Sequence, residues 1–199
     1  MKGRESGMPE EEYWRSFYDA ACIVEKLGCV QDGRENVVEF GSGYGTFTLP
    51  AARRTSGSIH ALDIEPDLVA LVENRARESG LANVRATLRD FVAAGTGLPD
   101  ASMDHAMVFN LLHLEEPIRL LAEAHRVLRP GGVVSIIHWK YDPSTPRGPS
   151  MDIRPRPAQC RAWAEAAGLR FLRDQDLSEC CRHHFGLLLV RPPAGSRAA

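Results

Sequence analysis

Hydrophobic positions along this chain alternate between short, nearly continuous apolar runs and segments in which apolar residues recur every three or four positions. The first pattern predicts buried strands and the second predicts amphipathic helices. We expect strands at 36–41, 58–63, 84–89, 104–110 and 132–139, and helices at 46–54, 66–79, 115–128 and 157–167. This alternation predicts a doubly wound α/β fold, with a mostly parallel sheet and helices on both faces.

The two ends of the chain add further elements to this fold. Residues 9–28 carry aromatic and aliphatic side chains at helical spacing, which predicts an N-terminal helix and a candidate lid over a ligand. Segments 169–177 and 183–190 are typical of two strands that finish the sheet in antiparallel fashion and bring it to seven strands. Residues 192–199 are rich in proline, glycine and alanine, and we expect them to be disordered. The prediction is one domain over 1–199.

Composition narrows the class of protein. With 44% hydrophobic and 25% charged residues, the chain is typical of a globular protein with one sizeable core. A net charge of -2 without a dense basic block argues against nucleic acid as a partner. No apolar run approaches the ~20 residues that span a bilayer, and the chain does not start with an apolar leader, so we expect a cytoplasmic protein without a membrane partner. A homodimer stays open.

The cysteines do not suggest a framework. There are five of them, an odd number without a C-x-x-C pair, which argues against both disulfides and a zinc site and favours free, buried thiols. Cys180-Cys181 followed by His183-His184 invites a metal hypothesis, but neighbouring residues of a strand point to opposite faces. We therefore expect no metal.

A glycine-rich turn follows the first predicted strand. The sequence Glu39-Phe40-Gly41-Ser42-Gly43-Tyr44-Gly45 places an acid and three alternate glycines between an apolar run and a helical pattern. Glycine permits positive φ there and lets a ligand lie against the main chain. The next strand ends at Asp63, about 20 residues further on, where parallel α/β sheets place a carboxylate for ribose hydroxyls. Together these features indicate a nucleotide-type ligand.

From about Val37 to Trp139 the chain resembles the class I S-adenosylmethionine-dependent methyltransferases. Four motifs carry this resemblance in the order typical of the family: the Glu39–Gly45 turn, the acids Asp63 and Asp90, and the helix, turn and strand of residues 126–134. Residues 110–114, Asn-Leu-Leu-His-Leu, are most similar to the ubiquinone/menaquinone-biosynthesis type. The resemblance implies a Rossmann-like methyltransferase fold, S-adenosylmethionine as cofactor, and methyl transfer to a small-molecule acceptor, which the sequence does not identify.

The resemblance also implies which residues of the glycine turn bind the cofactor. The backbone around Gly41, Ser42 and Gly43 would lie against the methionine part, and Gly45 would complete the turn. Glu39 would orient this loop and help to receive the ammonium group.

The ends of the next strands would bind the rest of the cofactor, by the same resemblance. Asp63 would accept the ribose hydroxyls, and Ile64 would pack on the adenine. Asp90 would accept the exocyclic amine, and Phe91 would donate its backbone amide to the ring. Asn110, after the fourth strand, would border the methionine and the methyl group.

Candidate catalytic residues follow the fourth and fifth strands. Methyl transfer depends mainly on orientation, and a base is needed only where the accepting atom must lose a proton. His113 and His138 are the tentative bases, with Tyr141 a weaker candidate, because all three come at the carboxyl edge of the sheet, where such folds bind ligands. A histidine at the end of a strand is, however, more often a packed or capping residue. The loop at 140–157 is long enough to shape an acceptor site, and its Arg154 and Arg156 either bind an anionic substrate or lie in solvent.

Two other function classes fit part of the pattern. A nicotinamide-dependent oxidoreductase also uses a glycine turn and a ribose acid, but its G-x-G-x-x-G spacing is absent, since Thr46 and Phe47 follow Gly45. A non-catalytic S-adenosylmethionine-binding or interaction protein is the other alternative, because cofactor binding alone would keep every strong motif. Methyl incorporation into an acceptor distinguishes that protein from an enzyme.

Overall fold

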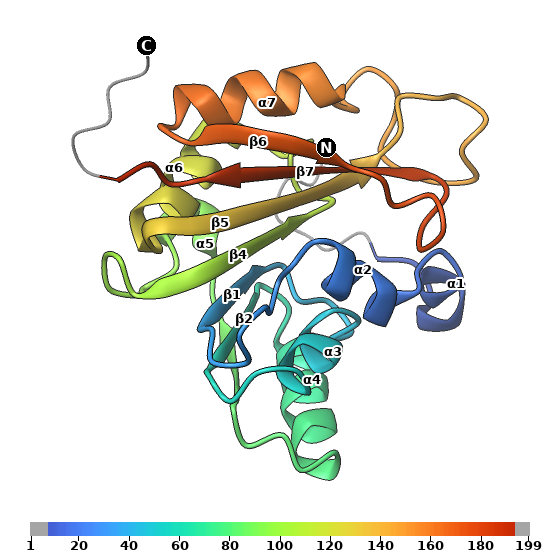
Figure 1. Cartoon of the computed structure of the whole chain (residues 1–199). Helices are drawn as coiled ribbons and strands as arrows, with labels where there is room; N and C mark the ends of the chain where they lie inside the picture. Colours follow the sequence, from blue (N-terminus) through green and yellow to red (C-terminus); the bar gives the residue numbers. More distant parts are fainter. Residues whose placement is uncertain (1–7, 194–199) are drawn as a thin grey trace.

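Seven strands form one sheet that separates two layers of helices in the computed structural model, which describes residues 8–193 (Figure 1). The strand order is β3-β2-β1-β4-β5-β7-β6; β1 to β5 pair in parallel, and β7 runs antiparallel to both of its neighbours. The predicted doubly wound, seven-stranded fold is therefore confirmed. The strands are β1 Val37–Phe40, β2 Ile59–Asp63, β3 Val84–Leu88, β4 Met103–Phe109, β5 Leu128–Trp139, β6 Arg170–Gln175 and β7 His184–Val190.

Proline and glycine mark several helix ends. Proline opens three of them, Pro66, Pro117 and Pro157, at positions where its missing N–H costs nothing. Gly80 follows the end of its helix at φ +69°. The helices are α1 Glu11–Arg15, α2 Ala20–Lys26, α3 Thr48–Ala52, α4 Pro66–Glu78, α5 Phe91–Ala94, α6 Pro117–Val127 and α7 Pro157–Ala166.

The period of two along the strands divides the core into two layers. In β1, Val38 and Phe40 pack with α5, α6 and α7, while Val37 faces the opposite layer with α2 and α3. In β4, Ala106 and Val108 share the first layer, and Met107 and Phe109 share the second. Because both faces are covered, apolar residues of the central strands β1 and β4 point into both layers.

Two elements differ from the prediction. Helix α5 was not expected, and it forms because the Asp90 side chain accepts a hydrogen bond from Ala93 N at 2.9 Å and caps the turn. Strand β5 begins earlier than expected, at Leu128, and runs through the proline and glycines before the predicted strand. Gly131 N donates to Arg191 O at 2.8 Å, so pairing with the residue after β7 holds this extension in place.

The N-terminal segment forms two helices instead of the one expected over 9–28. Helix α1 ends after Arg15, and α2 starts at Ala20 because the Asp19 side chain accepts from Cys22 N at 3.0 Å. Asp19 N is bonded to Cys180 O at 2.8 Å, so the break directs the chain toward the β6–β7 connection. Local apolar periodicity did not reveal this tertiary contact.

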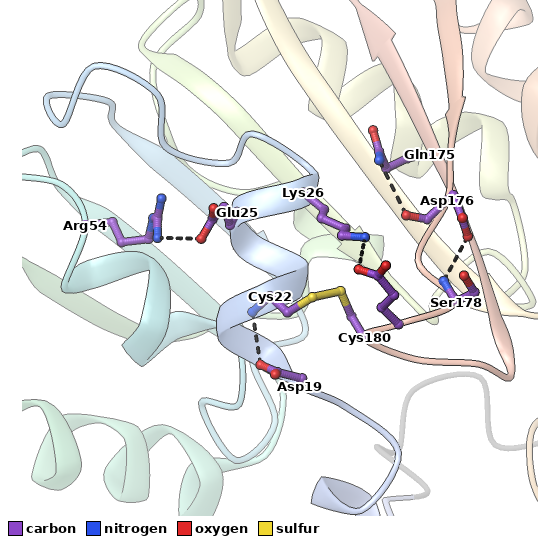
Figure 2. The surroundings of a disulfide bond; sticks show 10 residues. Asp19, Cys22, Glu25, Lys26, Arg54, Gln175, Asp176, Ser178 and Cys180 are labelled. Atoms are coloured by element: carbon purple, nitrogen blue, oxygen red, sulfur yellow. Dashed lines mark hydrogen bonds and ion pairs between the residues drawn. A yellow bond between two sulfur atoms is a disulfide. The ribbon is translucent and has the colours of Figure 1, made fainter.

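A disulfide between Cys22 and Cys180 joins α2 to the β6–β7 connection, with 5.7 Å between the Cα atoms (Figure 2). Lys26 Nζ donates to Glu179 Oε2 at 2.6 Å beside it. The prediction that all cysteines are free is wrong for this pair, since its members are 158 residues apart in sequence and meet only through the fold. Cys29, Cys160 and Cys181 are free and buried, as expected.

Three further expectations can be compared with the structure only over the residues that it describes. Across residues 8–193, no group of three His, Cys, Asp or Glu side chains is placed to hold a metal ion. No helix in the same range has the length and apolar character to cross a membrane. Of the tail expected to be disordered, residues 194–199 lie outside the described part of the chain.

Candidate functional site

A cavity of about 550 Å³ opens at the carboxyl ends of the parallel strands. This is the edge at which open α/β sheets bind their ligands. Its lining falls into two parts. The turn half consists of Gly41, Ser42, Gly43, Asp63, Ile64, Arg89, Asp90 and Phe91. The loop half consists of Trp14, Phe47, Phe109, Asn110, Leu111, His113, Leu114, Trp139, Arg147, Gly148, Pro149, Ser150 and Ile153, and Met8, Pro9, Thr46 and Val92 complete the lining.

Backbone hydrogen bonds fix the glycine turn to the neighbouring strand. Ser42 N donates to Leu62 O at 2.9 Å, and Gly43 N donates to Asp63 Oδ2 at 2.7 Å. Gly43 has φ +52°, and a Cβ added there would lie 2.9 Å from Cε of Met8. A side chain at this position is therefore strained and crowded, which is the condition for a backbone surface on which a ligand can lie.

Asp63 lies at the centre of the turn half and is buried at 3% exposure. Its Oδ2 accepts the hydrogen bond from Gly43 N, and its Oδ1 accepts one from Glu65 N at 3.0 Å. A carboxylate can accept about four hydrogen bonds, so these two leave capacity for the hydroxyls of a ligand. The predicted ribose contact is compatible with this arrangement and stays a prediction.

The end of β3 supplies the far wall of the turn half. Asp90 caps α5, and Phe91 packs edge-on against Phe40 with 5.3 Å between ring centroids. Arg89 donates to the carbonyl of Gly95 at 2.7 Å and to that of Ala94 at 2.6 Å. Ile64 adds an apolar surface from the end of β2. The predicted adenine residues thus border one cavity.

Glu39 and Gly45 do not line this cavity, in contrast to the other predicted cofactor residues. Glu39 is 1% exposed and accepts a hydrogen bond from Thr48 Oγ1, so it joins β1 to α3 behind the turn. Burial, together with the nearby Asp63 carboxylate, raises the pKa of Glu39 to about 8. In this position Glu39 supports the turn from behind, in agreement with a role in orienting the loop. Its contact with an ammonium group stays a prediction.

Three polar side-chain atoms beside the cavity have no hydrogen-bond partner within the described residues. They are Ser42 Oγ, Thr46 Oγ1 and Asn110 Oδ1, and all are buried. A buried polar atom without a partner costs about 1–3 kcal/mol, so native structures keep few of them. Asn110 also has φ +57°, a conformation that costs energy for a residue other than glycine. These orphaned atoms fit a polar ligand such as the methionine portion of S-adenosylmethionine.

Tyr18 connects Asn110 to the distant strand β7. Asn110 Nδ2 donates to the Tyr18 hydroxyl at 3.0 Å, and this hydroxyl is hydrogen-bonded to His184 Nε2 at 2.8 Å. Burial raises the pKa of Tyr18 and lowers the pKa of His184, so both stay neutral. Sequence reasoning did not find this link, because Tyr18 read as one aromatic of an amphipathic helix.

The two candidate bases are adjacent in space. His113 Nδ1 lies 3.2 Å from His138 Nε2, and only His113 lines the cavity. Burial lowers the pKa of His113 to about 4 and that of His138 to about 3, to which the neighbouring His113 also contributes. Both imidazoles are therefore neutral at pH 7.

Aromatic rings from distant segments form much of the loop half. Phe47 lies 4.9 Å from Phe109 and 5.3 Å from Tyr18, while Trp14 lies 4.8 Å from Tyr18, all between ring centroids. Trp139 lies 4.1 Å from His184 and continues this aromatic surface. The sequence indicated a cover by the N-terminal aromatics but not these partners, because the contacts join parts of the chain far apart in sequence.

The loop after β5 lies partly on the cavity, although not through the arginines first suspected. Arg147 lines the loop half, whereas Arg154 is buried among the carbonyls of its own loop. Arg156 covers the ring of Tyr141 at 3.6 Å from the centroid. Arg154, Arg156 and Tyr141 are all outside the cavity lining. Tyr141, the weakest candidate base, is thus not brought to the site.

Comparison with known sequences finds a family that matches the part of the chain carrying the turn half. Residues 37–132 match a family described as "Methyltransferase domain". A probable S-adenosylmethionine-dependent methyltransferase of Mycolicibacterium smegmatis is 37% identical over 131 residues, which cover 64% of this chain and 46% of that protein. A ubiquinone/menaquinone biosynthesis C-methyltransferase of a Geobacter species is 31% identical over 139 residues, covering 68% and 54%. The chain spans about half the length of the curated relatives it matches.

Solved structures show the same fold. A SAM-dependent methyltransferase from Aquifex aeolicus superposes with a TM-score of 0.78 at 22% identity, and the match covers 92% of this chain and 94% of that one. A geranyl diphosphate methyltransferase in complex with SAM superposes with a TM-score of 0.72 at 15% identity, over 94% and 93% of the two chains. At these identities the likeness concerns the fold alone, and it confirms the predicted Rossmann-like arrangement.

Proposed function

We propose, from the premise that residues 37–132 belong to the methyltransferase domain family, that this protein transfers a methyl group from S-adenosylmethionine to a small-molecule acceptor and releases S-adenosylhomocysteine. The observation that carries the proposal is the continuity of the cavity. One space of about 550 Å³ connects the glycine turn and Asp63 to His113 and Trp139. A cofactor and an acceptor can therefore lie in contact within it.

The turn half would hold the cofactor. Asp63 would accept the ribose hydroxyls, while Ile64, Asp90 and Phe91 would border the adenine. The amides of the turn and the orphaned atoms Ser42 Oγ, Thr46 Oγ1 and Asn110 Oδ1 would meet the polar methionine end. When bound, S-adenosylmethionine supplies a methyl group that is already activated on a sulfonium, so the protein's contribution is mainly orientation.

The histidine pair supports a proton-accepting role for His113. His138 Nδ1 lies 3.5 Å from the carbonyl of Trp139, which can only accept, so this contact favours a hydrogen on Nδ1 and leaves His138 Nε2 as an acceptor. His113 Nδ1 then donates to His138 Nε2, and His113 Nε2 keeps a free lone pair. His138 would act as a positioning residue, and His113 Nε2 would take a proton from an acceptor that must lose one.

The N-terminal segment would act as a cover over the turn half. Met8 lies over Gly43, the Tyr44 hydroxyl donates to Pro9 O at 2.9 Å, and Arg75 pairs with Glu11 at 2.7 Å. Glu11→Gln should weaken this closure and speed dissociation of S-adenosylhomocysteine, as measured by stopped-flow competition. Glu12→Gln, in the same turn of the helix, is the control. Equal dissociation rates for both variants would assign the segment to core packing.

A direct test is incubation of the purified protein with a cell extract and S-adenosylmethionine that carries an isotopically labelled methyl group. Mass spectrometry should find a labelled product that identifies the acceptor. The same incubation without the protein is the control for uncatalysed transfer. The alternative, a non-catalytic S-adenosylmethionine-binding protein, predicts cofactor binding without a labelled product from extracts of any source.

Cytoplasmic location and a homodimer are predictions from the sequence that still apply to the proposal. Fractionation of producing cells and sedimentation of the purified protein measure them. The disulfide bears on the first of these, because disulfides are rare in reducing compartments. Recovery of the protein in the cytoplasmic fraction with Cys22 and Cys180 reduced would agree with the sequence prediction.

A further inference from the structure

Arg154 is a buried guanidinium surrounded by its own loop. The residue is 7% exposed and lies in the connection between β5 and α7. Its Nε donates to Pro149 O at 3.0 Å, and its Nη2 donates to the same carbonyl at 2.7 Å. Its Nη1 donates to Lys140 O at 3.1 Å, to Asp142 O at 3.2 Å and to Thr145 Oγ1 at 2.5 Å.

This arrangement is unusual for a buried cation, because the hydrogen-bond partners are neutral oxygens. Removing a charge from water is costly unless hydrogen bonds replace the lost solvation. The carbonyls of residues 140–149 provide that replacement, and the guanidinium in return satisfies several loop carbonyls at once. Burial lowers the pKa of Arg154 from its ordinary value, but an arginine stays charged. The loop and the cation therefore stabilise each other's position.

The part of the loop that Arg154 organises also lines the cavity. Arg147, Gly148, Pro149, Ser150 and Ile153 belong to the loop half. Arg154 Nη2 is 3.3 Å from Arg147 O, and Arg154 N donates to Ser150 O at 3.0 Å. The positions of these lining residues thus follow from the position of one guanidinium.

Gly148 shows how closely this wall is packed. It has φ +125°, and a Cβ added there would lie 2.7 Å from Arg154 Nη2 and 2.9 Å from Cγ of Trp139. Contacts below 3.0 Å force a neighbour to move, and both neighbours are part of the wall or hold it. The glycine, the guanidinium and the indole therefore form one packed unit at the edge of the loop half.

We propose that Arg154 is a positioning residue that determines acceptor specificity, by holding residues 147–153 as a fixed wall of the loop half. The inference rests on the proposed methyl transfer and adds to it the residue that shapes the acceptor side. Arg154 does not line the cavity, so it acts through the wall and not by contact with the acceptor. Cofactor binding, which belongs to the turn half, should be independent of it.

The test uses three variants of the full chain. Arg154→Lys keeps the charge but replaces a planar group of five donors with a single ammonium, so it cannot bridge the same carbonyls. Gly148→Ala disturbs the same wall from the other side. Arg156→Lys is the matched control, because it changes an arginine of the same loop that contacts Tyr141 outside the cavity.

Affinity for S-adenosylhomocysteine is measured by calorimetry, and kcat and KM are measured with the acceptor identified from the labelled extract. For Arg154→Lys and Gly148→Ala we expect the acceptor KM to rise about 10- to 100-fold, the range that a small misplacement can cost. S-adenosylhomocysteine affinity should change less than about threefold, and amide hydrogen exchange should accelerate in residues 140–153. Arg156→Lys should match the wild type in all three measurements.

An unchanged acceptor KM, or a loss of S-adenosylhomocysteine affinity as large as the rise in KM, would overturn the positioning role. If Arg154→Lys does not fold, Gly148→Ala decides the question by the same readouts. If the wild-type protein binds S-adenosylhomocysteine but methylates no component of the extract, the proposed function fails and this inference fails with it. Turnover by the wild type together with an unchanged KM in the variants rejects this inference alone.

Discussion

The two halves of the cavity are held by different kinds of contact. The turn half is built at the carboxyl ends of the adjacent strands β1, β2 and β3, and hydrogen bonds from backbone amides, such as Ser42 N to Leu62 O and Gly43 N to Asp63 Oδ2, connect it. The loop half combines the N-terminal segment with the ends of β4 and β5 and the following loop. Tyr18 joins Asn110 across 92 residues and His184 across 166. A local motif thus suffices for one half, whereas the other depends on the whole fold.

Charge separates the halves as well. Behind the turn half, Glu39 has a pKa raised to about 8, so it is mostly protonated at neutral pH. In the loop half, His113 lines the cavity, with His138 against it and His184 against Trp139, and burial lowers the pKa of all three histidines. Glu39 and the three histidines are therefore uncharged at neutral pH, but a rise in pH ionises Glu39 whereas a fall in pH protonates the histidines.

The largest expected effect breaks the turn half. Gly43→Val should reduce S-adenosylhomocysteine affinity more than about 100-fold, because the added side chain is strained at φ +52° and occupies the surface beside Met8. Calorimetry measures the affinity. Gly80→Val is a matched control with the same kind of strain at φ +69° and nothing within 4 Å of its Cβ. Equal loss of affinity in both variants would assign the effect to global strain.

The next effect separates the stability of the fold from the turn half. Removing the disulfide with Cys22→Ser and Cys180→Ser should lower the free energy of unfolding by about 2–4 kcal/mol, because it releases a long loop in the unfolded chain. Denaturant unfolding measures the change. The affinity for S-adenosylhomocysteine should stay near the wild-type value, since the bond lies outside the cavity lining. A parallel loss of cofactor affinity would show that the turn half depends on this link.

A smaller effect sharpens the assignment within the turn half. Asp63→Ala should weaken S-adenosylhomocysteine binding by about 1.5–3 kcal/mol, the scale of hydrogen bonds to a charged group. Part of this loss would come from the freed amides of Gly43 and Glu65. Asp67→Ala, an exposed acid in the next helix, serves as the control in the same titration. Unchanged affinity in a folded Asp63→Ala protein would show that the ribose assignment is wrong.

The smallest effect uses pH to compare the halves. Unfolded histidines bind protons below about pH 6.5, but folded His113 and His138 do so only near 4 and 3, so acidification from 6.5 toward these values should lower stability. Folded Glu39 keeps its proton up to about pH 8, whereas the unfolded side chain loses it near 4.5, so stability should also fall as pH rises through that window. In thermal unfolding, Glu39→Gln should remove the loss of stability above pH 6.5, whereas the loss on acidification, which comes from the histidines, should persist. If stability still falls above pH 6.5 in Glu39→Gln, the assignment of that loss to Glu39 is wrong.

The sequence predicted the turn half far better than the loop half, and the contacts explain the difference. Strand periodicity placed β1 to β5 within a few residues, and the glycine turn and Asp63 adjoin one another because neighbouring strands end together. The pairing of Cys22 with Cys180 requires that α2 and the β6–β7 connection meet, which no local pattern encodes. The hydrogen bond between Tyr18 and His184 could not be predicted for the same reason, because its partners meet only in the fold. The burial of Arg154 was also not predicted, because only the folded loop supplies its hydrogen-bond acceptors.

The central claim is that the turn half is an S-adenosylmethionine site, and isothermal titration calorimetry of the purified protein tests it most directly. S-adenosylmethionine and S-adenosylhomocysteine should each bind with measurable heat at one site per chain, because the turn, Asp63 and the orphaned polar atoms match their hydrogen-bonding groups. NADH should give no heat of binding under the same conditions. Tight binding of NADH with no heat from either sulfur compound would contradict the account.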